Sequence, residues 1–150
     1  MELMKWKQRK QGADYLRSAQ FLTRLIVANR DSLVESHYNE MLKICIWKLT
    51  EAEGSSKHNT RFRSTGAIQN PKGKLNHEHV VTSRDMRQRI METPDLVDEI
   101  IAEAIGCTVL KSEHQELERV EKLDPNLRGW DRYRAAGIEV WDLLTGERVV

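Results

Sequence analysis

The sequence predicts a mixed α+β fold, a helix-rich single domain with short strands. Its 150 residues are the usual size of one domain. Apolar residues recur at helical spacing in several long segments, and the β-branched runs between them are short. With 39% hydrophobic and 31% charged residues, the chain has enough apolar material for one core beneath a well-solvated surface.

The N-terminal part, residues 1–53, is predicted to be helical. Residues 13–29 carry apolar side chains at the spacing of one face of an amphipathic helix. A second apolar stripe predicts a helix over residues 33–53, with Asp31 or Ser32 as its N-cap. The glycine that follows ends this helical part of the chain.

The middle of the chain alternates short strands with helices. A strand is expected over residues 75–82, followed directly by a helix. Residues 93–105 predict a further helix, because they begin with Thr-Pro and proline is favoured at the first helical position. Gly106 is placed to cap the C-terminal end of this helix. Residues 107–110 predict a buried strand, after which Ser112 is placed to cap a helix over residues 113–123.

The C-terminal segment, residues 124–150, begins with Asp-Pro-Asn, which stops the preceding helix. Residues 138–142 alternate apolar and polar side chains and predict a strand before a Thr-Gly turn.

Composition also restricts the class of protein. No apolar segment approaches the roughly 18 residues that a membrane helix needs, and the amino terminus lacks a secretory signal, so a cytoplasmic protein with no membrane partner is expected. Cys45 and Cys107 lie far apart and form no CxxC pair. They are expected to be buried free thiols rather than zinc ligands or a disulfide.

The segment 54–74 is predicted to be a basic loop or hairpin. No Asp or Glu lies between Gly54 and His77, and cationic side chains attract a nucleic-acid backbone through Coulomb forces and counterion release. The same composition fits a solvated loop that binds nothing. The candidate nucleic-acid contacts are Lys57, Arg61, Arg63, Lys72 and Lys74.

The most informative stretch for function is Asn76-His77-Glu78-His79, at the start of a β-branched run. On a strand, the period of two places His77 and His79 on one face, where two imidazoles can share an ion, and sends Glu78 to the other. Glu78 joins them only if the strand twists or ends there. The alternative interpretation is a pair of partly exposed strand histidines without a ligand.

The order of these elements resembles the ββα-metal site of HNH-family nucleases. The resemblance rests on a strand that carries Glu78 and His79, then a second strand, then a helix whose first turn holds His114. We delimit this HNH-like element at residues 75–123. The resemblance implies that Glu78 and His114 bind a divalent ion, with His77 beside them, and that His79 is the general base.

The function that this resemblance implies is metal-dependent hydrolysis of phosphodiester bonds in DNA or RNA. The ion would be Mg, Mn, Ni or Zn, since imidazole and carboxylate ligands suit all four. We expect His79 and His114 to lie close enough to serve one ion or one phosphate.

Two alternatives remain open. No Asn occurs between His79 and His114, so the residue that orients the base in HNH nucleases has no counterpart. This difference favours a noncatalytic nucleic-acid-binding or protein-inhibitory module on the same scaffold, which would also admit a protein partner. The other alternative is a structural metal site, in which an ion with a closed ligand shell joins the strand to the helix.

Overall fold

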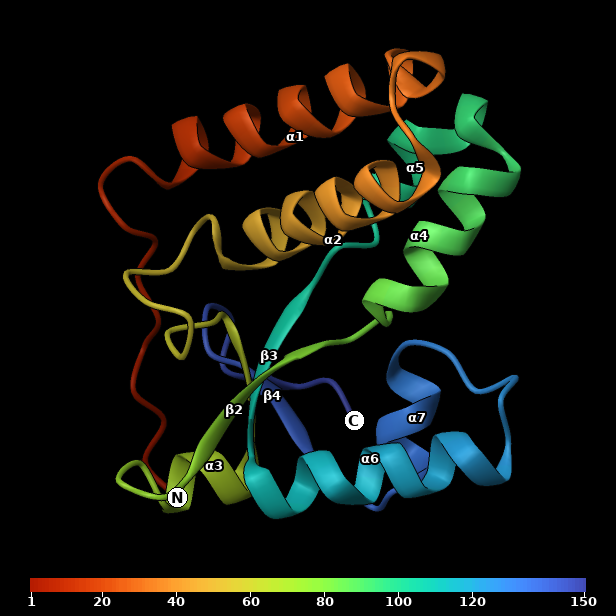
Figure 1. Cartoon of the computed structure of the whole chain (residues 1–150). Helices are drawn as coiled ribbons and strands as arrows, with labels where there is room; N and C mark the ends of the chain where they lie inside the picture. The colour runs from red at the N-terminus through yellow and green to blue at the C-terminus, as the bar shows by residue number, and fades with distance from the viewer.

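The computed structural model describes all 150 residues and confirms the α+β fold as one domain (Figure 1). Its five strands form one mixed sheet in the order β2-β3-β1-β4-β5. β1 and β3 are parallel, and every other pairing is antiparallel. The strands are β1 (Phe62–Ser64), β2 (Leu75–His79), β3 (Gly106–Leu110), β4 (Val140–Asp142) and β5 (Glu147–Arg148).

Seven α-helices surround this sheet, together with 3₁₀ turns at Arg30–Ser32 and Pro94–Leu96. None of the helices is both long and apolar enough to cross a lipid bilayer. The α-helices are α1 (Gly12–Ala28), α2 (Glu35–Glu51), α3 (Thr65–Gln69), α4 (Ser83–Glu92), α5 (Val97–Ile101), α6 (Lys111–Leu123) and α7 (Trp130–Ala135).

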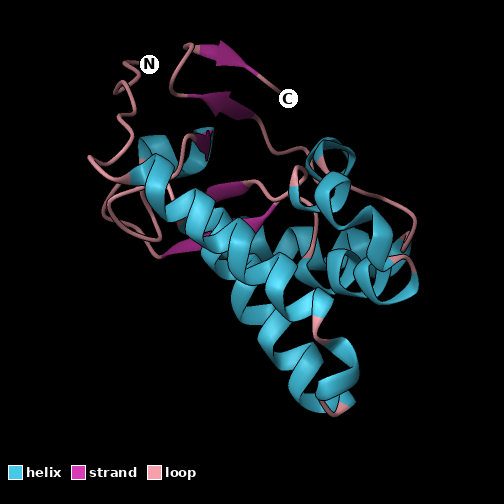
Figure 2. Ribbon diagram, turned by 90° about the horizontal axis from the view of Figure 1, so that it is seen from above, coloured by secondary structure: helices cyan, strands magenta, loops and turns pink.

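The helices fall into two groups. In Figure 1, α1, α2, α4 and α5 gather beyond one end of β2 and β3, while α3, α6 and α7 lie near the other. Figure 2 shows the antiparallel pair α1 and α2 leading away from the strands. Each group has its own apolar cluster. The cluster among α2, α4 and α5 holds Tyr38, Leu42, Ile46, Met86, Ile90 and Ile100. The cluster between the sheet, α6 and α7 holds Val80, Cys107, Val109, Leu117, Tyr133, Ile138 and Val140.

The long periodic helices are confirmed, but two of the predicted caps are wrong. α2 begins after Val34, and no side chain caps it, because Asp31 and Ser32 lie in the preceding 3₁₀ turn. α6 continues directly from β3, so its N-cap is Leu110 rather than Ser112. A carboxylate oxygen of Glu113 accepts the free Leu110 N–H at 2.8 Å and takes over the capping role.

The helix predicted over residues 93–105 is shorter than expected. α5 ends at Ile101, and Gly106 begins β3 instead of capping the helix. A Cβ at Gly106 would lie 2.8 Å from His77 Cε1 and 2.8 Å from Thr50 O. This glycine is therefore explained by a close approach of β3 to its neighbours.

The basic segment 54–74 contains two elements that the sequence did not indicate, β1 and α3. Ser64 ends the strand and caps the helix, and its Oγ accepts the Ala67 N–H at 3.0 Å. In the C-terminal segment, α7 was likewise not expected. Both cysteines are buried and free, as predicted.

Candidate functional site

β2 directs its histidines and its glutamate to opposite faces of the sheet. His77 and His79 pack beside Trp47 of α2, with ring centroids 4.8 and 5.2 Å away. Glu78 points the other way, where its Oε2 lies 2.5 Å from His114 Nδ1. The alternation expected of a regular strand is retained through the whole motif.

His77 has both ring nitrogens engaged by protein groups. Nδ1–H donates to Lys57 O at 2.5 Å, and Nε2 accepts the Thr50 hydroxyl at 2.9 Å. Burial lowers the pKa of His77, consistent with a neutral ring in this arrangement. His77 therefore links α2 to the loop that follows it through these two hydrogen bonds. To bind an ion, the His77 ring would have to lose one of the two.

His79 lies in a dry and partly enclosed environment. Its ring meets Trp47 edge-on, and its Nδ1 is buried without a hydrogen-bond partner. Burial lowers the pKa of His79 from 6.5 to about 4, and nearby positive charge from His77 and Arg132 adds to this effect. The imidazole is consequently neutral at pH 7 and a weak base.

Glu78 and His114 form a carboxylate–imidazole pair between β2 and the first turn of α6. Because an ionised carboxylate only accepts hydrogen bonds, His114 Nδ1 carries the proton. His114 Nε2 then faces Glu118 one helical turn later, 3.4 Å from its Oε1. The Glu78 side chain is 10% exposed and that of His114 30% exposed, so the pair leads from the interior to the surface.

Arg132 of α7 lies behind this pair, with its side chain only 2% exposed. Nη2 is 3.4 Å from Glu78 Oε1 and 3.3 Å from Glu121 Oε2. Nη1 donates to the carbonyl oxygens of His79 and Val80, both at 3.1 Å, where β2 ends. Sequence reasoning missed Arg132, since nothing local distinguishes it from the other arginines of its segment.

The structure therefore brings Glu78 and His114 together but separates His114 from His79. The expectation that both histidines serve one ion is wrong for this conformation. The physical reason is that Glu78 and His79 are neighbours on a strand, so only one of them can face α6.

A groove of about 620 Å³ runs between α4 and α6 and reaches Glu118. No hydrophobic side chain lines it. Arg84 on α4 and Lys122 on α6 both line it, and neither forms an ion pair with an acidic side chain. The groove thus combines carboxylates with free cations beside the exposed end of the Glu78–His114 pair.

The predicted nucleic-acid contacts are not equivalent. Arg61 is held by Asp142, with Nε 2.8 Å from Oδ1 and Nη2 2.5 Å from Oδ2, which raises the pKa of Arg61 and lowers that of Asp142. Arg63 is partly buried and has no hydrogen-bond or ion-pair partner, and burial lowers its pKa. Its neighbour on β4 is Trp141. The remaining candidates, Lys57, Lys72 and Lys74, are exposed.

No three His, Cys, Asp or Glu side chains converge on one point in this structure. The donor pair that best fits an ion is His114 Nε2 with Glu118 Oε1, because two atoms 3.4 Å apart can both reach an ion at about 2.1 Å. Glu78 then stands behind the imidazole, as carboxylates commonly do at metal-bound histidines.

Comparison with known proteins adds no family assignment. No protein-family model, curated protein or solved structure matches this chain.

Proposed function

We propose that this protein is a metal-dependent nuclease that hydrolyses phosphodiester bonds in nucleic acid. The observation that supports it is the chain of contacts from Glu78 through His114 to Glu118, set across two antiparallel strands and the helix that follows them. This is the ββα order on which the resemblance to HNH nucleases rests. His114 keeps the metal-binding role that the resemblance implies, and Glu118 replaces Glu78 and His77 as its partner in that role.

Each residue has a separate task in this proposal. His114 Nε2 and the Glu118 carboxylate would hold a divalent ion. Glu78 accepts a hydrogen bond from His114 Nδ1–H and thereby fixes the tautomer and orientation of the imidazole. Arg132 holds Glu78 in place. When bound, the ion supplies stabilisation of negative charge on the scissile phosphate and the leaving oxygen.

The groove between α4 and α6 accommodates the substrate strand. Arg84 and Lys122 line it beside Glu118, where they can contact consecutive phosphates. His79 has no place in this arrangement, because its ring faces Trp47 on the other side of β2.

The test is cleavage of single- and double-stranded DNA and RNA in Mg, Mn, Ni or Zn. We expect His114→Ala to reduce cleavage by about 10²-fold or more, the order usual for lost metal ligation or its support. Glu118→Gln should raise the metal concentration needed for half-maximal rate. His37→Ala is the matched control, since His37 is an exposed histidine on α2.

The His79→Gln variant separates this proposal from the roles that the resemblance implies. Cleavage should survive this substitution if His114 and Glu118 form the centre. Loss of cleavage in His79→Gln with full activity in His114→Ala would instead assign the reaction to the other face of β2.

The second candidate is a noncatalytic nucleic-acid-binding module. It is favoured by the engagement of both Glu78 oxygens within the protein and by the free guanidinium of Arg63 beside Trp141, a cation and an aromatic ring suited to phosphate and base. Binding that falls steeply with salt and is weakened by Arg63→Glu, without cleavage in any ion, supports this candidate. Arg17→Glu on α1 is the control for a general change in charge.

A further inference from the structure

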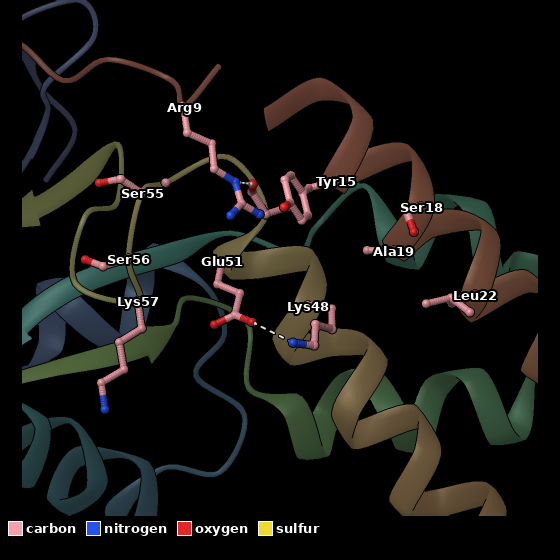
Figure 3. Close-up of a pocket in the computed structure, with 12 residues that line it drawn as sticks. Arg9, Tyr15, Ser18, Ala19, Leu22, Lys48, Glu51, Ser55, Ser56 and Lys57 are labelled. Carbon is pink, nitrogen blue, oxygen red and sulfur yellow. Dashed lines mark hydrogen bonds and ion pairs between the residues drawn. The ribbon is translucent and has the colours of Figure 1, made fainter. Parts of the chain in front are cut away.

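A second hollow lies between α1, α2 and the loop 54–57, with a volume of about 240 Å³ (Figure 3). None of the residues of the Glu78–His114 site lines it. We propose that this cavity binds a small phosphomonoester of the size of a nucleoside monophosphate. The proposal does not rest on the nuclease function.

Small residues keep the cavity open where the two helices meet the loop. Ala19 of α1 and Ala52 at the end of α2 are almost fully buried and leave room between the backbones. Gly54 allows the loop to fold back tightly, because a Cβ there would lie 2.0 Å from Asn59 O. The hollow is therefore a consequence of residue choice at three positions.

One wall is a stacked pair, Arg9 and Tyr15. The guanidinium carbon of Arg9 lies 3.4 Å from the centroid of the Tyr15 ring. Arg9 Nε–H donates to Ala52 O at 2.7 Å, which anchors the stack to the end of α2. The terminal nitrogens of Arg9 have no carboxylate partner, so they remain available to an anion. In Figure 3 both side chains border the same opening.

The charge around the cavity is positive. Lys48 and Lys57 join Arg9, against the single carboxylate of Glu51. That carboxylate already accepts the Trp47 indole N–H at 2.8 Å and lies 3.3 Å from Lys48 Nζ. Lys57 has no acidic partner. Three serine hydroxyls, from Ser18, Ser55 and Ser56, also line the cavity.

These groups select the ligand class. A phosphate group carries several acceptor oxygens and two negative charges, which suit ammonium, guanidinium and hydroxyl donors together. The flat Arg9–Tyr15 stack and the apolar side chain of Leu22 offer a surface for a planar base. The volume excludes an oligonucleotide, since pockets for single drug-sized ligands already measure roughly 300–1,000 Å³.

Isothermal titration of the full chain with AMP, adenosine and inorganic phosphate tests this proposal. AMP should bind more tightly than either of its parts. Lys57→Glu should weaken AMP at least 10-fold, and it preserves the fold because only the backbone oxygen of Lys57 is used structurally. Ser18→Trp should abolish binding by filling the cavity without removing charge. Lys43→Glu, an exposed lysine on α2 outside the cavity, should leave binding unchanged.

Several outcomes would overturn the assignment. Adenosine or inorganic phosphate binding as tightly as AMP would show that the cavity does not select a nucleotide. Equal AMP affinity in wild type and in both cavity variants would place the ligand elsewhere. No heat from any of the three compounds at millimolar concentration would remove the site altogether.

Discussion

Replacing Arg132 with Met should strongly destabilise the fold. The side chain is 2% exposed, and its guanidinium contacts two carboxylates and two backbone carbonyls. Without it, the carboxylate of Glu78, 10% exposed, loses its arginine partner and keeps only its contact with His114. Breaking a buried ion pair on one side costs about 3–5 kcal/mol. For a domain of this size that corresponds to a melting temperature lower by roughly 6–20 °C.

Urea unfolding followed by circular dichroism measures this loss. Arg134→Met is the matched control on the same helix, because its ion pair with Asp131 is exposed and should contribute less than about 1 kcal/mol. Combining Arg132→Met with Glu78→Gln should cost less than the sum of the two single changes, since the charge left unpaired is removed. An Arg132→Met protein as stable as the Arg134→Met control would refute the role assigned to this guanidinium.

Three further predictions follow from burial and close packing. The pKa of His79 is about 4 in the fold and near 6.5 in the unfolded chain, so stability should be complete above pH 6.5 and fall by roughly 3 kcal/mol as the pH drops to about 4. His79→Gln should flatten this pH dependence in urea titrations, and an unchanged slope would contradict the assignment. Cys45 and Cys107 should resist thiol reagents in the native protein and both react in denaturant, because burial raises the pKa of each thiol. Gly54→Ala should cost about 1–3 kcal/mol in the same unfolding assay, since its Cβ would meet backbone rather than a movable side chain.

The sequence predicted best where a pattern repeats over several turns. α1 and α2 each run for 17 residues and bury one stripe, which gives helical periodicity enough length to be recognised. β1 has three residues and α7 six, too few for a period to stand out from chance. Gly106 was assigned to a helix end, although its true neighbours come from α2 and β2. Such contacts between distant segments leave no local signature.

At the candidate site, too, contacts between elements that are close in the chain could be predicted and contacts between distant segments could not. The order of the elements correctly brought Glu78 and His114 together, because two antiparallel strands and the next helix are joined closely in the chain. The position of Arg132, 54 residues beyond Glu78, depends on how α7 packs beneath β2. No spacing rule connects those two residues. The ion pair between Arg61 and Asp142 could not be predicted either, because these two residues are also far apart in the chain.

The place of β1 in the sheet has a consequence for how the protein is made. This strand is central, yet Phe62 pairs with Cys107 on one side and with Asp142 on the other, both much later in the chain. During synthesis β1 leaves the ribosome long before either neighbour exists. A nascent chain halted after α6 would leave one side of β1 unpaired, the kind of surface that recruits other chains. Completion of the last residues is therefore what covers the second side of β1, and premature termination should yield aggregates rather than a smaller working domain.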